Sequence, residues 1–180
     1  KLDRSTMNFG YATGGSVPLA QTLGISNIGG GTLSWSIASD VSWLAFTPAS
    51  GSGNAYVDVS IVPGSIGVGT YTANITVTSS GAVNSPQTMT VKLVVKSYSQ
   101  DSPPFGDFAT PTDGYVISGS LPITGWVLDD IEVSSVKLYY GNGSHIGNAV
   151  FVEGARSDIG EAYPDYPRSA FAGWGYMMLS

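Results

Sequence analysis

The sequence contains no cysteine and only one histidine in 180 residues. Disulfide bridges and thiolate metal ligands are therefore excluded, and any folded core must be stable without them. Charged residues make up 11% of the chain, less than half of the usual share of about a quarter. No apolar run approaches the roughly 18 residues that a membrane span requires, so none is expected.

Basic residues are few, and the charge is unevenly distributed. The net charge is −6, and residues 101–180 hold ten acidic side chains against three basic ones. Because no basic patch is present to neutralise phosphates, nucleic acid is not expected as a partner. The chain begins with Lys1 and has no apolar leader stretch, which indicates a mature or internal segment.

Short segments of alternating polar and apolar residues fill the first hundred positions. Leu33, Trp35 and Ile37 share one phase of such a segment, which places Trp35 in a predicted core. Further strands are expected at residues 21–27, 55–61, 70–77 and 87–95. The sequence therefore predicts an all-β protein of two tandem immunoglobulin-like β-sandwiches, with less than about a tenth of its residues in helices.

The predicted boundaries are a first domain at residues 1–96, a linker at 97–104 and a second domain at 105–180. The linker lacks alternation, and Pro103 with Pro104 makes its end stiff and extended. Strands of the second domain are expected at residues 115–118, 121–128, 135–140, 146–153 and 173–179. A short helical turn is expected near residues 158–162.

A series of motifs runs through the first domain. They are NFG at 8–10, ISN at 25–27, GGGTLSW at 29–35, SWL at 42–44, PASG at 48–51, GTYTANITV at 69–77 and NSPQT at 84–88. Through these motifs residues 7–95 resemble the BACON family of bacterial Ig-like domains. The resemblance implies a sandwich of seven or eight strands. The family is proposed to bind carbohydrate or mucin, although many members resemble plain spacers in large surface proteins.

The second domain carries motifs of its own: PFG at 104–106, GWVLDD at 125–130, VKLY at 136–139, FVEGAR at 151–156, YPDYP at 163–167 and GWGYM at 173–177. With them it resembles a second bacterial Ig-like family, found in multi-module exported proteins. Modules of that family continue through two more strands, so the resemblance implies an incomplete sandwich with an open cleft and an unpaired strand edge.

Two explanations of the incomplete sandwich remain open. A neighbouring subunit could donate a strand, with Lys1–Met7 as a short free donor, and head-to-tail donation would build a fibre. Alternatively, the chain is part of a longer protein that holds the remaining strands.

Three aromatic side chains are candidates for stacking on sugar rings: Trp43, Tyr163 and Tyr166. Trp43 precedes Leu44 at a loop-to-strand junction, where core packing is the alternative. Asn142 begins an Asn-Gly-Ser triplet in an expected hairpin loop and is the candidate for N-glycosylation.

Asp129, Asp130 and Glu132 form an acidic cluster at a strand end and are candidate calcium ligands. The alternative is that they are solvated carboxylates, one of which caps a turn. No other cofactor is expected. Ser144 and His145 lie on a glycine-rich turn without a third catalytic group, so the chain is not expected to be an enzyme.

The expected function is that of a non-catalytic structural or adhesive module of an extracellular or cell-surface bacterial protein or fibre. Its partners would be neighbouring modules or subunits, including further copies of the chain in a homopolymer. One alternative is a carbohydrate-binding module with glycans as partners. Another is an accessory segment of a larger secreted enzyme.

Overall fold

The computed structural model describes residues 1–179. The chain divides into two compact units, Lys1–Asp101 and Ser102–Ser180. Strands account for 46% of the residues and helices for 7%, which confirms the predicted all-β class and the low helix content.

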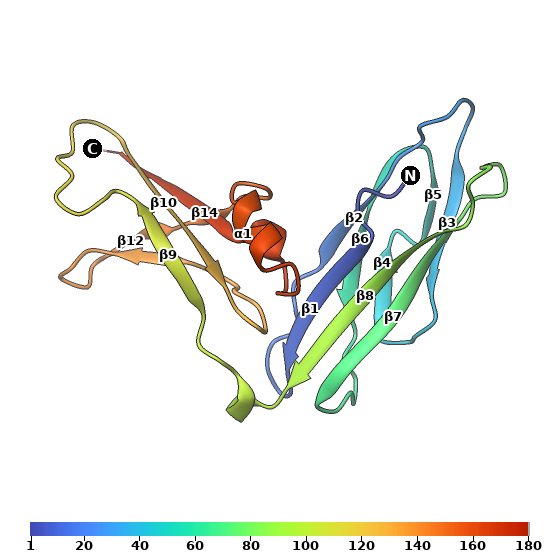
Figure 1. Cartoon of the computed structure of the whole chain (residues 1–180), viewed down its shortest axis with the longest axis horizontal. Helices are drawn as coiled ribbons and strands as arrows, with labels where there is room; N and C mark the ends of the chain where they lie inside the picture. The colour runs from blue at the N-terminus through green and yellow to red at the C-terminus, as the bar shows by residue number, and fades with distance from the viewer. Residues whose placement is uncertain (180) are drawn as a thin grey trace. The chain divides into compact units, whose positions relative to one another are not determined.

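Eight strands and one 3₁₀ turn make up the first unit (Figure 1). They are β1 (Thr6–Ala12), β2 (Gln21–Ile25), β3 (Ser34–Ser39), β4 (Leu44–Thr47), β5 (Ser50–Ser52), β6 (Ala55–Ile61), β7 (Gly69–Thr78), β8 (Gln87–Lys96) and η1 (Tyr98–Gln100). The strand order is β1-β8-β7-β3-β5 in one sheet and β2-β6-β4 in the other. In Figure 1, β1 lies beside β8, and these two strands run parallel.

The apolar residues on the inward faces of the strands form the core of this unit. Every second residue is buried from Ala73 to Val77 on β7 and from Met89 to Val95 on β8, because successive side chains of a strand point to opposite faces. Seventeen buried apolar residues form one cluster, and Trp35 is among them, as its phase on the strand predicts.

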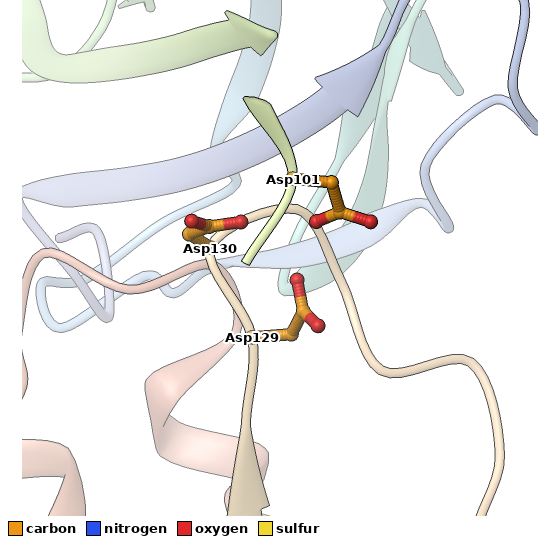
Figure 2. A group of neighbouring side chains, drawn as sticks. All are labelled: Asp101, Asp129 and Asp130. Atoms are coloured by element: carbon orange, nitrogen blue, oxygen red, sulfur yellow. The ribbon is translucent and has the colours of Figure 1, made fainter. Parts of the chain in front are cut away.

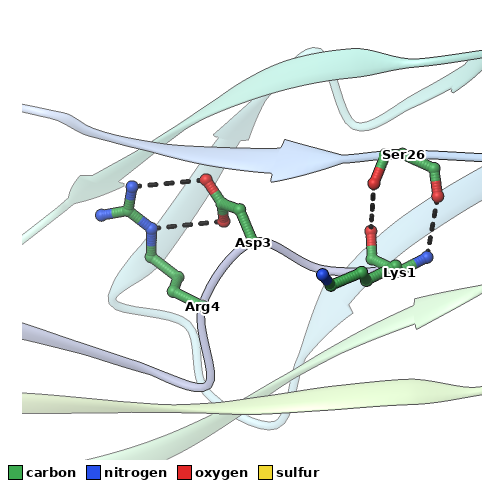
Figure 3. A network of polar contacts seen from close by, with 4 residues as sticks. All are labelled: Lys1, Asp3, Arg4 and Ser26. Carbon is green, nitrogen blue, oxygen red and sulfur yellow. Dashed lines mark hydrogen bonds and ion pairs between the residues drawn. The ribbon is translucent and has the colours of Figure 1, made fainter.

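The N-terminal segment is paired within its own unit (Figure 3), so the prediction of a free donor strand at Lys1–Met7 is wrong for this structure. Leu2 bridges to Ile25 of β2, and the backbone N–H of Ser26 donates to the carbonyl of Lys1 at 2.9 Å. From Thr6 onwards the chain pairs with β8. These bonds satisfy backbone groups that a free segment would leave to water.

Between residues 102 and 179, the second unit has six strands, one helix and one 3₁₀ turn. They are β9 (Phe105–Thr110), β10 (Leu121–Leu128), β11 (Lys137–Tyr139), β12 (His145–Asn148), β13 (Val150–Phe151), α1 (Ser157–Ala162), η2 (Ser169–Phe171) and β14 (Gly173–Met178). One sheet has the order β13-β14-β10-β9, and β11 with β12 forms a separate two-stranded sheet. The short helix lies where the sequence predicts a helical turn.

Two apolar clusters stabilise the second unit. Leu121, Ile123, Leu138 and Trp174 are buried in one, and Leu128, Ile159 and Ala172 in the other. The predicted strand at residues 115–118 is wrong. This segment follows a turn in which the N–H of Tyr115 donates to Thr112, and its side chains are exposed. β9 was not predicted, because all but its first residue are exposed and it therefore shows no buried phase.

Candidate functional site

The three aromatic candidates for sugar binding take part in packing. Trp43 is half-buried and packs against the core of the first unit. Tyr163 and Tyr166 pack against the Leu128 cluster of the second unit. Their rings meet Phe105 edge-on at centroid distances of 5.4 and 5.3 Å. Packing therefore occupies part of each of these three aromatic side chains. Their role in stacking on sugar rings stays a prediction.

Asp129 and Asp130 directly follow β10 (Figure 2). Asp129 is buried, and its Oδ1 accepts a hydrogen bond of 2.7 Å from the N–H of Ile131. A carboxylate that bonds the backbone two residues further on stabilises a turn. This is the turn-capping role that the sequence left open beside calcium binding.

Glu132, the third calcium candidate, bonds a cation of the protein. Its Oε1 lies 3.0 Å from Nη1 of Arg168, and both side chains are largely buried. The guanidinium of Arg168 also lies over the ring of Phe171, 4.7 Å from its centroid. The pair therefore joins the loop after β10 to the segment around η2. Calcium binding by the three carboxylates stays a prediction.

Polar side chains of the β11–β12 hairpin form hydrogen bonds with other residues of the same hairpin. Oδ1 of Asn142 accepts a hydrogen bond of 2.9 Å from the N–H of Ser144. Nε2 of His145 lies 3.2 Å from Oδ1 of Asn148. Asn142 is exposed, and its glycosylation stays a prediction.

A hollow of about 240 Å³ lies on the outward face of β2 and β6 in the first unit. Its lining consists of Asp3, Gly24, Ile25, Ser26, Asn54, Ala55 and Tyr56. Tyr56 is directly opposite Gly24 in the sheet, and its side chain is 78% exposed. An aromatic ring thus stands in solvent beside a glycine, with polar side chains around it.

Neighbouring contacts hold the polar lining of this hollow in place. Both carboxylate oxygens of Asp3 accept hydrogen bonds of 3.3 Å from Arg4 (Figure 3). The Asp3 side chain fits over Gly24, since a Cβ at that glycine would lie 2.8 Å from Oδ2 of Asp3. Oδ1 of Asn54 accepts a bond of 2.7 Å from the N–H of Asn27. The lining therefore offers fixed hydrogen-bonding groups beside an exposed ring.

No motif or local pattern in the sequence predicts this hollow as a whole. Tyr56 stands on the outward phase of the strand at 55–61, so its exposure could have been read from the alternation. Asp3 is distant in sequence, and only the pairing of the N-terminal segment with β2 brings it to Gly24.

Residues 6–96 match the family model described as the viral BACON domain. The chain belongs to this family. The match extends from β1 to β8 and confirms the resemblance found at residues 7–95. We call the first compact unit, Lys1–Asp101, the BACON unit.

No family match supports the resemblance of the second unit, which stays a prediction. The matching family is described as viral, whereas the sequence motifs pointed to bacterial modules.

No curated protein matches the chain. Similar solved structures include a GH5 xyloglucanase from Bacteroides ovatus, with 17% identity and a TM-score of 0.43 over 82% of this chain and 30% of that chain. The periplasmic chaperone SfaE has 10% identity and a TM-score of 0.42, over 74% of this chain and 94% of that one. The YadV chaperone has 9% identity and a TM-score of 0.41, over 83% and 76%. At these values the likenesses carry no argument about function.

Within residues 1–179, no helix is both long and apolar enough to cross a membrane.

Proposed function

We propose that the chain is a non-catalytic extracellular module that binds carbohydrate through the hollow around Tyr56 in its BACON unit. The exposed Tyr56 ring beside fixed polar groups is the observation that supports this proposal most directly. Membership of the BACON family and a composition rich in glycine with few charges also support it. The module would act on the outside of a cell or of a virus particle.

Sugar recognition needs an apolar surface and a few well-placed polar groups. The face of a tyrosine ring supplies apolar area, while its hydroxyl stays hydrated. Ser26 and Asn54 can exchange hydrogen bonds with sugar hydroxyls, and the Asp3 carboxylate can accept them. Such convergence of polar groups around an apolar surface is typical of small-ligand sites. The Tyr56 ring is exposed, which favours part of a long glycan over an enclosed small molecule.

The hollow around Tyr56 is proposed to bind its ligand without reacting with it. The lone histidine contacts Asn148 and the ring of Tyr139, and neither residue is a nucleophile positioned for transfer chemistry. In the hollow itself, Asp3 pairs with Arg4 and faces no second carboxylate in the lining. Glycoside hydrolysis requires two carboxyl groups placed across the scissile bond.

A second candidate function is that of a structural or adhesive module between neighbouring modules or subunits. The observation that favours it is that each compact unit contains apolar clusters of its own. Modules with separate cores can be joined in series without loss of folding, as extracellular arrays require. Glycan binding and a structural role are compatible in one chain.

A glycan array probed with the whole chain tests the proposal. We expect selective binding to some of the glycans, and loss of that binding in a Tyr56→Ala variant. Tyr98→Ala is the matched control, because Tyr98 is 79% exposed and lies in η1, away from the hollow. Absence of binding to any glycan, or equal binding by the Tyr56→Ala variant, would refute this site.

A further inference from the structure

A recess of about 330 Å³ lies where β2 and β7 end in the BACON unit. Its walls are the loop at residues 26–33, which follows β2, and the turn at residues 81–84, which lies between β7 and β8. Asn27 fixes the loop, because its Nδ2 donates to the carbonyl of Gly31 at 2.9 Å and its Oδ1 accepts from the N–H of Gly29 at 3.1 Å. Ser26 lines both this recess and the hollow around Tyr56, so the two are adjacent.

A smaller cavity of about 30 Å³ adjoins the recess on its inner side, and Leu33, Ala82 and Asn84 line both spaces. The apolar part of its wall consists of Leu2, Ile25, Leu33, Trp35, Val77 and Ala82. Among the described residues that line the recess or the cavity, Lys1 is the one with a charged side chain. A volume of this size has room for about two water-sized groups.

Two buried polar side chains in the wall of the inner cavity have no hydrogen-bond partner in the described part of the chain. They are the indole of Trp35, through Nε1, and the hydroxyl of Ser79, through Oγ. Trp35 is 4% exposed and Ser79 is 9% exposed. Because buried polar groups of native proteins are nearly always paired, these two point to a polar group that enters the cavity and bonds them.

The two unpaired groups indicate the chemistry of the entering group. An indole N–H can only donate, so it requires an acceptor oxygen, whereas a hydroxyl can also accept from an N–H. An amide supplies both a carbonyl oxygen and an N–H. The methyl of an acetamido group suits the apolar wall, and its methyl and carbonyl oxygen are each about the size of a water molecule. A neutral amide also requires no counterion in the cavity.

Entry requires a small movement of the turn after β7, because solvent hardly reaches the two unpaired atoms. The N–H of Ala82 donates to the carbonyl of Ser79 at 3.4 Å, which is long for such a bond. Val83 is fully exposed and adds no packing to the turn. In contrast, the N–H of Ser79 donates to Oγ of Ser85 at 2.8 Å, which holds Ser79 in the wall while the tip of the turn moves.

We propose that the BACON unit binds N-acetylated sugars, with the acetamido group in the cavity beside Trp35 and Ser79 and the sugar ring in the recess. The acetamido oxygen accepts from the indole N–H of Trp35, and the acetamido N–H donates to Oγ of Ser79. This inference rests on the proposed carbohydrate binding and deepens it. It adds a second subsite next to the hollow around Tyr56 and names the class of sugar.

The test is an NMR titration of the whole chain with methyl N-acetylglucosaminide at millimolar concentrations. The indole N–H resonance of Trp35, assigned with a Trp35→Phe variant, should move downfield because the N–H gains an acceptor. Saturation transferred from the protein should be strongest at the acetyl methyl of the sugar. Methyl glucoside has a hydroxyl in place of the acetamido group and should produce neither effect.

Protein variants locate the subsite. Ser79→Ala removes the hydroxyl that accepts from the amide and should weaken binding of methyl N-acetylglucosaminide roughly fivefold. Ser80→Ala is the matched control, because Ser80 is exposed and lines neither the recess nor the cavity, and it should leave the affinity unchanged. Tyr56→Ala should also leave it unchanged, because the monosaccharide lies in the recess and not in the hollow.

These variants separate failure of this inference from failure of the site at Tyr56. If array glycans bind through Tyr56 while the indole resonance of Trp35 does not respond to the N-acetylated sugar, the subsite is wrong and the hollow stands. If the resonance responds while Tyr56→Ala binds every array glycan normally, the hollow is wrong and the subsite stands.

Three results would overturn the inference. They are an indole resonance of Trp35 that does not move with methyl N-acetylglucosaminide, an equal movement with methyl glucoside, and equal affinity of Ser79→Ala for the acetylated sugar. N-acetylalanine methylamide is the last probe. If it binds as tightly as the acetylated sugar, the cavity accepts acylated peptides and the assignment to sugars is wrong.

Discussion

Trp35 and Gly51 face each other across β3 and β5, and the indole ring occupies the space where a side chain at Gly51 would lie. A Cβ at Gly51 would be 2.7 Å from Cζ2 of Trp35. Real contacts between carbon atoms are ordinarily closer to 3.5–4.0 Å, so the ring or the strand would have to move. The glycine therefore permits the buried position of Trp35.

Gly51→Ala should destabilise the BACON unit by about 1–3 kcal/mol, because overpacking forces side chains away from their preferred rotamers. Gly30→Ala is the matched control, since Gly30 has nothing within 4 Å of the added Cβ. Chemical denaturation of both variants measures the two effects. Equal stability of Gly51→Ala and the natural chain would show that Trp35 does not pack on Gly51.

Asp40 accepts two hydrogen bonds from Asn74 of β7. The backbone N–H of Asn74 donates to Oδ1 at 2.9 Å, and its side-chain amide donates to Oδ2 at 3.0 Å. Bonds to the ionised form lower the pKa of Asp40 below its usual value, and the backbone bond contributes most. The stabilisation is present above the pKa of Asp40 in the unfolded chain and is lost as the pH falls through the lower folded-state pKa.

Asn74→Ala should raise the pKa of Asp40 part of the way to its usual value, because the side-chain bond is lost and the backbone bond remains. An NMR titration of the Asp40 carboxyl carbon measures the shift. Thr72→Ala, on an exposed position of the same strand, should leave this pKa unchanged. A pKa that does not respond to Asn74→Ala would mean that the amide bond is absent in solution.

Single residues differ in how far the sequence reveals their roles. The strand period alone predicts that Trp35 is buried, because Leu33 and Ile37 share its phase. The exposure of Tyr56 follows from the same rule. The proximity of Asp3 and Gly24 does not, since it depends on a pairing over some twenty residues that no local pattern encodes.

At the scale of elements, the Glu132–Arg168 pair joins two segments of the second unit. Replacing either partner leaves the other charge largely buried without its counterion. Glu132→Gln or Arg168→Met should therefore lower the stability of this unit by about 1–3 kcal/mol. The double variant should recover part of the lost stability.

The control is Asp158→Asn, which breaks the exposed pair with Arg156 and should leave the melting temperature unchanged. Similar effects of the exposed and buried pairs would contradict this view.

The bonds of Asp129 and Glu132 also predict how the chain responds to metal ions. Because Asp129 caps a turn and Glu132 pairs with Arg168, we expect the melting temperature to be the same in chelator and in millimolar calcium. A ligand bound only to the folded state would raise the melting temperature by mass action. A reproducible rise in calcium that Asp130→Asn abolishes would instead establish the calcium site.

Most elements with one buried face were predicted from the sequence. β1 was not, although Met7 and Phe9 are buried on it. β6, β7 and β8 alternate clearly and were found. β9 is almost wholly exposed and carries no such signal. Residues 115–118 are rich in β-forming side chains, yet they lie in a connection where no described strand pairs with them. Strand propensity alone does not decide pairing, because the partner strand supplies the packing.

At the scale of the whole molecule, the two compact units differ in the size of their buried apolar clusters. The BACON unit has the larger core and carries the hollow with Tyr56 on the outward face of its smaller sheet. The buried apolar clusters of the second unit are smaller. The proposal therefore assigns glycan recognition to the first unit.

The most direct test of carbohydrate binding is an NMR titration of the isotopically labelled chain with the best glycan from an array. We expect amide shifts to concentrate at Asp3, Gly24, Asn54 and Tyr56. The second unit should be unaffected, and Tyr56→Ala should abolish the shifts. Shifts centred on Trp43, or on Tyr163 and Tyr166, would contradict the site proposed here, and the absence of any shift at saturating glycan would contradict carbohydrate binding itself.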